Sequence, residues 1–426
     1  VRAYELSPLH AGATSKHADR APDNPLPATH TDQGPMKYVV YIIKENRTYD
    51  QVFGDLPQGN GDPDLCIFGR EVTPNHHAIA EEFVLLDNFY VEAEVSADGH
   101  EWSMGGYATD YTERTWPPAY GRKASATLPG GASVGIGGFS HGNHPLFIPG
   151  NGYLWDACAR AGVSYRSYGE FVRNTGPIGS PVESVYPAVQ GHFDPDYRTV
   201  DHEYMDIQRA EVFLDELAEF EEGGDLPQFI VIRIGNDHTS GTTPGAPTPR
   251  AAVADNDLAL GMILEGLSNT SFWSEMCVFV VEDDAQNGPD HVDAHRSVCL
   301  VAGPYVKRGE VVSDLYSTCS VVRTMELILG LPPLSQFDAA ARPMYDCFTP
   351  TPDPTAYAAR PAQWNLEEQN TETAWGAELS LAMDFTQDDV NDDLLLNDII
   401  WRSVRGADSP MPRPVRAAFV TILEED

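Results

Sequence analysis

Carboxylates and two imidazoles crowd one short loop that lies between two apolar segments of the chain. The loop, residues 282–296, has the sequence EDDAQNGPDHVDAHR, and the apolar runs 276–281 and 298–302 flank it as strand-like segments. Ligand sites of α/β sheets lie where strands end, and carboxylate with imidazole is a ligand set for hard-to-borderline divalent cations. The loop therefore predicts a metal or catalytic site, with an acidic surface turn as the alternative.

Two further polar clusters also come directly after apolar, strand-like runs. Residues 44–50 (KENRTYD) follow the nearly continuous apolar run 36–43, and residues 235–239 (GNDHT) follow the run 229–234. Parallel strands bring their carboxyl ends to one edge of a sheet, so the three clusters should meet in space. Such a set can hold one or two divalent ions. The side chains predicted to converge are Glu45, Asn46, Asp237, His238, Asp283, Asp284, His291 and His295.

Several of these residue types also have structural interpretations. Asn46 or Asp237 could cap a following helix, and His238 could be an ordinary loop histidine. Arg296 could pair with the acidic loop or contact a phosphate. The metal stays open, because carboxylates with asparagine favour Ca²⁺, Mg²⁺ or Mn²⁺ whereas histidines admit Zn²⁺ or Fe. Four histidines without ligand context are expected at the surface, namely His76, His77, His141 and His144.

A nucleophile is offered by the segment 86–102, LDNFYVEAEVSADGHEW. Ser96 follows an extended run and opens a small, glycine-containing turn that would leave its hydroxyl exposed. A serine in a turn is usually a cap or a solvent-facing residue, but this one should lie beside three metal-type clusters. Coordination to a cation lowers the pKa of a serine hydroxyl and makes the alkoxide available near neutrality.

Three motifs in order resemble a known family: ENRTYD after the first apolar run, LLDNFY leading into VSADGHEW, and EDDAQNGPDHVDAHR. They are similar to the bacterial phosphoesterase family that includes phosphocholine-specific phospholipases C and respiratory-burst-inhibiting acid phosphatases, a branch of the alkaline phosphatase superfamily. The resemblance covers roughly residues 36–340. It implies an alkaline phosphatase-like fold and metal-dependent hydrolysis of phosphoric esters.

The resemblance also implies roles for individual residues. Ser96 would be the nucleophile that forms a phosphoseryl intermediate, and the ion that contacts it would be held by Glu45, Asn46, Asp283 and Asp284. Beyond the resemblance, the residue types predict a second metal site, or assistance to the leaving oxygen, from Asp237, His238, His291 and His295. His100 would contact the substrate, and Arg296 would either contact it or pair with the acidic loop. The sequence departs from the family pattern at Asp284, usually Glu, and at the turn 97–100, so the phospholipid substrate is not carried over.

The alternation of elements predicts the fold. Strand, polar cluster and helix recur at least three times, which indicates an α/β fold with a doubly wound, mostly parallel sheet. Helices are expected at about 76–83, 204–222, 251–267, 318–329 and 389–404. The predicted organisation is an N-terminal arm or linker over 1–35, a catalytic domain over 36–340 with a loop-rich insertion or cap at about 103–200, and a C-terminal extension over 341–426 that packs on the core.

The net charge of the chain limits the classes of partner that it can bind. With 27 basic and 64 acidic residues the net charge is −37, which disfavours nucleic acid or an anionic membrane as the main partner. No apolar run approaches the roughly 18 residues of a membrane span. The acidic, lysine-poor composition predicts a secreted, periplasmic or cell-surface protein, with a high-salt setting as a further interpretation. A first residue other than Met indicates either that an export signal has been removed or that the chain was cut from a longer one. Association with β-propeller or other extracellular domains is expected from the nearest subgroup.

Two other functions stay open at this stage. The first is a sulfate or phosphonate ester hydrolase of the same fold. The second is a secreted surface or filament protein whose degenerate site binds a cation structurally.

Overall fold

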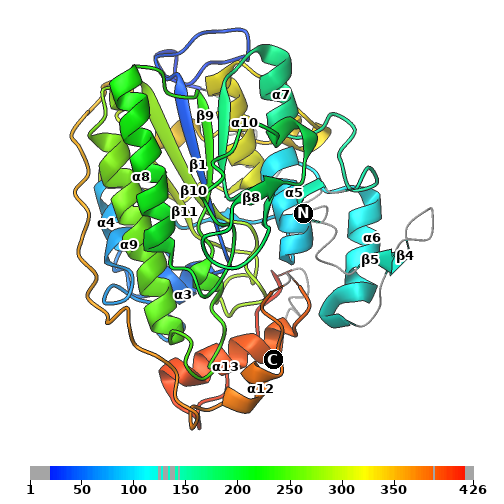
Figure 1. Ribbon diagram of the computed structural model, residues 1–426. Helices are drawn as coiled ribbons and strands as arrows, with labels where there is room; N and C mark the ends of the chain where they lie inside the picture. The colour runs from blue at the N-terminus through cyan, green and yellow to red at the C-terminus, as the bar shows by residue number, and fades with distance from the viewer. Residues whose placement is uncertain are drawn as a thin grey trace, which may run out of the picture.

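The computed structural model describes residues 20–122, 126–127, 133–134, 140–142, 144–386 and 389–417. Its centre is a seven-stranded sheet in the order β12-β2-β11-β10-β1-β9-β6 (Figure 1). The strands span β1 Tyr38–Lys44, β2 Val84–Leu86, β6 Tyr165–Tyr168, β9 Phe229–Arg233, β10 Met276–Glu282, β11 Cys299–Ala302 and β12 Glu310–Val312. The α/β fold with a mostly parallel sheet is therefore confirmed.

Three parallel strands form the core of this sheet. β1 pairs in parallel with β10 on one side and with β9 on the other, and β6 continues the parallel run beyond β9. Residues 39–43 of β1 are all fully buried, as expected for a continuous apolar strand covered on both faces. β11 is antiparallel to both β10 and β2, so one half of the sheet is mixed.

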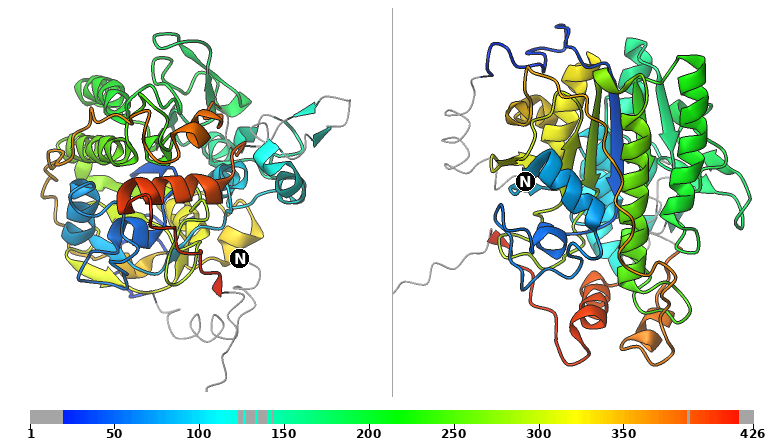
Figure 2. Two further views of the ribbon diagram at one scale, coloured as in Figure 1. Left: turned by 90° about the horizontal axis from the view of Figure 1, so that it is seen from below. Right: turned by 90° about the vertical axis from the view of Figure 1, so that its left-hand side faces the viewer.

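Helices cover both faces of the sheet. In Figures 1 and 2, α4, α8 and α9 lie on one face, and α5, α7 and α10 lie on the other. The helices span α3 Tyr49–Phe53, α4 Pro74–Glu82, α5 Ser96–Gly105, α6 Asp110–Ala119, α7 Leu154–Ala161, α8 Asp206–Gly223, α9 Pro249–Ser268, α10 Thr318–Leu329, α11 Gln336–Ala340, α12 Ala377–Leu381 and α13 Asp393–Arg405. The five helices predicted from periodicity agree with α4, α8, α9, α10 and α13 to within a few residues. In the described part of the chain, no helix has the length and apolarity that a membrane crossing requires.

Two regions differ from the sequence-based expectation or add to it. Residues 103–200, predicted to be a loop-rich insertion or cap, supply α6, α7 and β6, which is an edge strand of the main sheet. Two polar residues lie between the tyrosines of β6 (YRSY), so it lacks the apolar run that marked the central strands. Near the other end of the chain, Leu396, Ile400 and Trp401 of α13 pack against Val253 and Ala254 of α9, beside the carboxyl ends of the parallel strands (Figure 1).

Candidate active site

The register of β1 and β10 places two of the polar clusters side by side. Lys44 and Glu282 are partners at the ends of these parallel strands, and the N–H of Asp283 donates to the Lys44 carbonyl at 3.0 Å. Glu45 and Asn46 therefore leave the sheet next to Asp283 and Asp284. All four side chains are buried, with at most 2% of each residue exposed.

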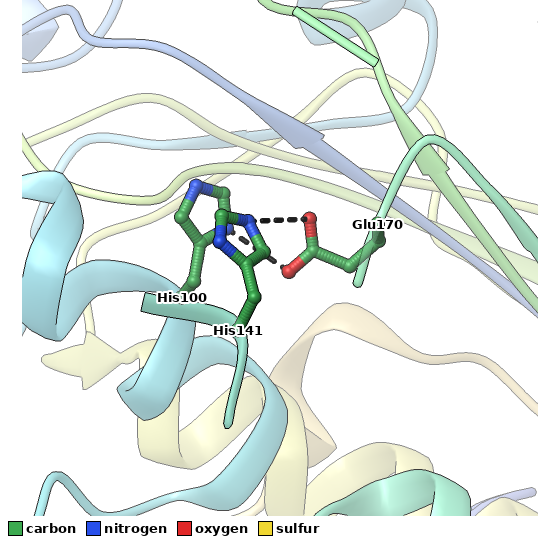
Figure 3. Close-up of side chains that lie close together, drawn as sticks. All are labelled: His100, His141 and Glu170. Atoms are coloured by element: carbon green, nitrogen blue, oxygen red, sulfur yellow. Dashed lines mark hydrogen bonds and ion pairs between the residues drawn. The ribbon is translucent and has the colours of Figure 1, made fainter. Parts of the chain in front are cut away.

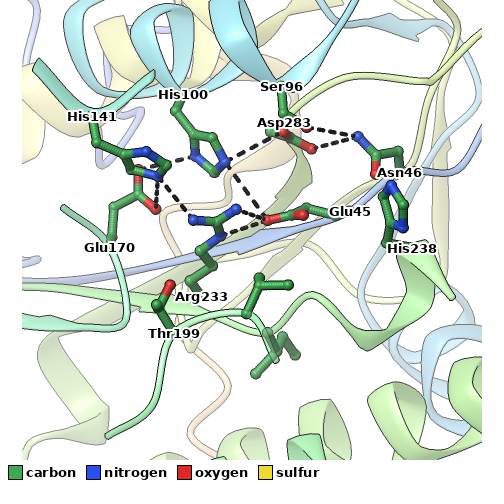
Figure 4. Close-up of polar contacts among 12 residues, drawn as sticks. Glu45, Asn46, Ser96, His100, His141, Glu170, Thr199, Arg233, His238 and Asp283 are labelled. Carbon is green, nitrogen blue, oxygen red and sulfur yellow. Dashed lines mark hydrogen bonds and ion pairs between the residues drawn. The ribbon is translucent and has the colours of Figure 1, made fainter. Parts of the chain in front are cut away.

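Helix α5 brings Ser96 to this strand end, as its first residue. The Ser96 hydroxyl donates to Asp284 Oδ2 at 3.2 Å. It accepts from Asn46 Nδ2 at 3.4 Å (Figure 4). The close approach of the first turn depends on Gly99, because a Cβ there would lie 2.9 Å from the Asp283 carbonyl oxygen. The structure thus gathers Ser96, Asn46, Asp283 and Asp284, with hydrogen bonds from Asn46 Nδ2 to both aspartates at 3.2 and 2.6 Å.

One turn further along α5, His100 completes a candidate cation site. Its Nε2 lies 3.5 Å from Asp283 Oδ2 and 3.6 Å from Glu45 Oε1, and the ligand atoms of these three residues lie within 4.8 Å of one another. Asn46 Oδ1, His100 Nε2 and Asp283 Oδ2 are buried and have no hydrogen-bond partner. Buried polar atoms are normally satisfied, so this group of orphaned atoms indicates a place for a cation.

Three residues that the sequence analysis did not assign to the site lie around His100. Glu170 Oε1 accepts from His100 Nδ1 at 3.0 Å, and the ring of His141 lies 4.5 Å from that of His100 (Figures 3 and 4). Arg233 contacts His141 Nε2 through Nη1 at 2.8 Å and forms a buried ion pair with Glu45. Arg233 ends β9, so its position at a strand end could have revealed it, whereas Glu170 and His141 lie in irregular segments that carry no such signal.

The expectation of surface histidines is wrong for three of the four residues. His76, His77 and His141 are buried. His76 and His77 bind Asp257 and Asp55 at 2.6 and 2.8 Å, because a buried imidazole needs a partner. Histidines in irregular sequence can therefore still be internal.

Burial and mutual repulsion shift the titration of the acidic residues. Burial, with Glu45 adding to it, raises the pKa of Asp283 to about 7. Burial and the neighbouring Asp283 raise the pKa of Asp284 well above its usual range. Burial would raise the pKa of Glu45 as well, but Arg233 and His100 outweigh it and hold that pKa below its usual range.

The imidazole of His100 is shifted in the opposite sense. Burial alone would lower its pKa, but the neighbouring carboxylates of Glu170 and Glu45 raise it to about 10. Two carboxyl groups thus favour the protonated form and one imidazole favours the imidazolium. Raised pKa values of this kind are expected where metal ligands lie close together without their ion, because protons then compensate the charge that the ion would compensate.

Asp237 and His238 lie at the strand end but face other partners. Asp237 Oδ2 accepts from Lys44 Nζ at 2.7 Å and its Oδ1 accepts from the Glu45 N–H at 3.1 Å. Glu282 accepts from the same Lys44 at 2.8 Å. His238 bonds the Thr239 carbonyl through Nδ1 and Gln286 through Nε2, each at 2.8 Å. Asp237 therefore neutralises the buried lysine and positions Glu45, and the structure does not bring it to Ser96.

His291 and Arg296 belong to a separate charged cluster. His291 Nδ1 lies 2.6 Å from Asp50 Oδ2, and Arg296 forms ion pairs with Asp50 and Asp290 at 2.9 and 3.0 Å. Asp50, Asp290 and His291 have ligand atoms close enough for a cation, but the Arg296 guanidinium already compensates both carboxylates. Arg296 is fully buried, so its structural interpretation is favoured over contact with a substrate phosphate.

His295 forms a third set of contacts. Its Nε2 lies 2.9 Å from Glu94 Oε1, and its Nδ1 lies 2.7 Å from Asp293 Oδ1. Both ring nitrogens are engaged, so the structure does not bring His295 to the Ser96 cluster. The residues that converge are Glu45, Asn46, Ser96, His100, Asp283 and Asp284.

Substitution of His291 distinguishes the two clusters. We expect His291→Ala to lower the melting temperature by a few degrees, because the buried Asp50 loses a partner, while kcat/KM for ester hydrolysis stays within about threefold of the parent. Thermal unfolding and initial rates measure the two effects. A loss of activity without a loss of stability would place the working cation at Asp50 and His291 instead.

A carboxylate from the C-terminal segment also reaches this site. Asp389 Oδ1 accepts from the N–H of Ser96 at 3.2 Å, and its Oδ2 accepts from the N–H of Ala97 at 2.6 Å. The N-terminus of a helix carries partial positive charge and unpaired N–H donors. Asp389 therefore satisfies the start of the helix that holds the candidate nucleophile.

The chain is similar to several known proteins. The Phosphoesterase family model matches residues 60–332, more than half of the chain. A protein in the alkaline phosphatase superfamily from Vibrio parahaemolyticus is similar at 16% identity and a TM-score of 0.45, covering 75% of this chain and 73% of that one. Murine ectonucleotide pyrophosphatase/phosphodiesterase 5 is similar at 11% identity and a TM-score of 0.48, covering 73% of this chain and 100% of that one. No curated protein matches the sequence significantly.

Proposed function

Because the chain belongs to the Phosphoesterase family and is an ester hydrolase, we propose that it cleaves phosphoric esters through Ser96 with the help of a divalent cation. The observation that carries this proposal is the position of Ser96 Oγ at the start of α5. It lies 3.2 Å from Asp284 Oδ2 and beside the buried, unpartnered atoms of Asn46 and Asp283. A hydroxyl held among potential cation ligands is the arrangement that nucleophilic catalysis by serine needs.

The residues present fit a cation. Glu45, Asn46, Asp283, Asp284 and His100 would hold it, with the Asn46 and His100 atoms that lack partners as ligands. Glu170 would orient His100, as a carboxylate commonly does for a ligating imidazole. A nitrogen ligand among carboxylates favours Mn²⁺, Zn²⁺ or Fe²⁺ over Ca²⁺ and Mg²⁺. The bound ion would lower the pKa of the Ser96 hydroxyl and neutralise charge on the phosphoryl oxygens.

The chain's own residues then account for two displacement steps. In the first, the Ser96 hydroxyl proton passes to Asp284, the nearest acceptor, Oγ bonds to phosphorus, and the bond from phosphorus to the ester oxygen breaks. The leaving oxygen takes a proton from water and departs as the alcohol. In the second, a water oxygen bonds to phosphorus and releases a proton to solvent, the bond to Oγ breaks, and Oγ regains the proton held by Asp284 as phosphate leaves.

The rates on three chromogenic esters test this proposal. We expect the full chain to cleave an aryl phosphate monoester or diester, to lose that activity with a chelator, and to regain it with Mn²⁺ or Zn²⁺. Aryl sulfate should be a poor substrate. Preferential cleavage of the sulfate would indicate a sulfate ester hydrolase. Stoichiometric binding of a cation without turnover of any ester would favour a structural cation site.

Stabilisation by the cation should depend on pH in a defined direction. Asp283, with its pKa raised to about 7, and His100, with its pKa raised to about 10, hold protons that the cation must displace. Cation affinity therefore rises with pH across the neutral range. We expect Mn²⁺ to raise the melting temperature by several degrees more at pH 8 than at pH 6. The His291→Ala variant should keep this difference, and an equal shift at the two pH values would contradict the ligand assignment.

A location outside the cytoplasm is a further part of the proposal. It is supported by the net charge of −37, which suits a protein that stays soluble at high salt or outside the cell. In the described part of the chain, Cys66, Cys158, Cys277, Cys299 and Cys347 form no disulfide, so the proposal does not depend on disulfides.

A further inference from the structure

The N-terminus of the helix that holds Ser96 is capped by a carboxylate from a distant part of the chain. Val95 is the N-cap residue of α5 and has no side chain to accept from the first N–H groups. Asp98, within the helix, bonds back to the Val95 N–H at 3.1 Å, but the N–H groups of Ser96 and Ala97 turn to Asp389. Asp389 lies 293 residues from Ser96 in the sequence. The pairing is therefore tertiary and places a fixed negative charge beside the nucleophile.

The Asp389 backbone is anchored beside the end of α6. The carbonyl oxygen of Asp389 accepts from the Gly121 N–H at 3.1 Å. Four residues later, the Asp393 N–H donates to the Tyr120 hydroxyl at 3.0 Å. These contacts hold Asp389 at the site from both the C-terminal segment and the segment after α6.

The two N–H groups that Asp389 occupies are natural donors to a phosphoryl oxygen. They lie at the positive end of a helix, next to the attacking Oγ, where oxyanions are bound and stabilised. The same site holds the buried, unpartnered atoms Asn46 Oδ1 and Asp283 Oδ2. A phosphoryl group entering here meets the charge of Asp389 and must share or displace its hydrogen bonds.

The repulsion between Asp389 and the incoming phosphoryl group depends on the charge of that group. A phosphomonoester near pH 8 is a dianion with three non-bridging oxygens, whereas a phosphodiester is a monoanion with two. We propose that Asp389 is a specificity-determining residue that makes the site prefer monoanionic phosphodiesters over dianionic phosphomonoesters. The inference rests on the proposed hydrolysis at Ser96. One additional unit of charge repelled at close range in a partly buried site changes relative rates on the order of 10- to 100-fold.

The Asp389→Asn variant isolates that charge, because asparagine retains an oxygen that can accept from a helix N-terminus. The ratio of kcat/KM for bis(p-nitrophenyl) phosphate to that for p-nitrophenyl phosphate is measured on the full chain with Mn²⁺. We expect the variant to lower this ratio about tenfold, mainly through faster monoester cleavage. Glu378→Gln, which neutralises an exposed carboxylate of the same C-terminal segment, is the matched control and should leave the ratio unchanged.

Two outcomes overturn the inference. The first is an unchanged ratio in Asp389→Asn. The second is an equal loss of both activities, which would make Asp389 a helix cap alone. Either result leaves the proposed function standing if the parent chain hydrolyses esters in a Ser96-dependent way.

Binding of unreactive anions provides a readout that is independent of turnover. Calorimetry at pH 8 compares inorganic phosphate with dimethyl phosphate on the parent chain and on Asp389→Asn, each with Mn²⁺. The variant should bind inorganic phosphate about tenfold more tightly and dimethyl phosphate with little change. Equal affinities of parent and variant for inorganic phosphate would contradict the role of the Asp389 charge.

Discussion

Replacing Ser96 with alanine should lower kcat/KM for phosphate-ester hydrolysis by about 10⁴-fold or more, because the covalent route needs its oxygen. The fold should survive the change. Ser96 begins α5, and within the described residues its side chain bonds to Asn46 and Asp284 of the candidate site, so the melting temperature should move little. Initial rates on p-nitrophenyl phosphate and thermal unfolding of the full chain measure the two quantities.

A second serine on the same helix provides the control. Ser103 of α5 is also buried, but it lies near Tyr41 in the core and not at the strand end. Ser103→Ala should keep kcat/KM within about twofold of the parent. Equal activity losses in both variants would show that packing of α5 is responsible, and full activity in Ser96→Ala would remove the serine from the chemistry.

The Asp283→Asn variant should be nearly inactive and yet at least as stable as the parent without cation. Activity should fall by about 10³-fold, because the cation loses a charged ligand. Stability should rise near pH 8, where the Asp283 carboxyl, with its pKa of about 7, is ionised in a buried and acidic environment. A group whose pKa is raised by folding loses its contribution to stability as pH rises, and the amide removes this penalty.

Asp290 in the same loop should show the opposite behaviour. Its carboxylate is buried, and both of its oxygens share the Arg296 Nε–H in a bifurcated hydrogen bond at 3.1 Å. Asp290→Asn should cost roughly 3 kcal/mol of stability, because it weakens a buried ion pair, and it should retain most of the activity at a temperature where it is folded. If Asp290→Asn lost activity and Asp283→Asn kept it, the catalytic cluster would lie around Asp50, Asp290 and His291.

The convergence at the strand ends could be predicted because it depends on topology alone. Once β1 and β10 are parallel neighbours in register, Glu45 and Asn46 must emerge beside Asp283 and Asp284. The apolar runs of the strands carry this information directly. Ser96 needed the family resemblance in addition, since a serine at a turn is not specific on its own.

The sequence could not separate catalytic residues from structural ones within the polar clusters, because the same side-chain types serve both roles. Asp237, His291 and Arg296 have the residue types of a catalytic site, but Lys44 and Asp50 engage them as partners in buried charge clusters. Which carboxylate meets a lysine or arginine depends on side-chain positions across several elements.

The supporting residues that the sequence missed come from segments with no period. Glu170 and His141 lie within the region expected to be loop-rich, and Asp389 reaches Ser96 across most of the chain length. Local patterns carry no signal for pairings at such separations. Structural coordinates are required to find them.

The account depends most directly on a phosphate that is transiently attached to Ser96. Acid quenching of the full chain during turnover of an aryl phosphate, followed by peptide mass spectrometry, measures this. The account predicts one added phosphoryl group on the peptide that contains Ser96, absent from Ser96→Ala and from chelated protein. Hydrolysis at the same rate with the phosphate on another residue, or with no trapped phosphate and an active Ser96→Ala variant, would contradict it.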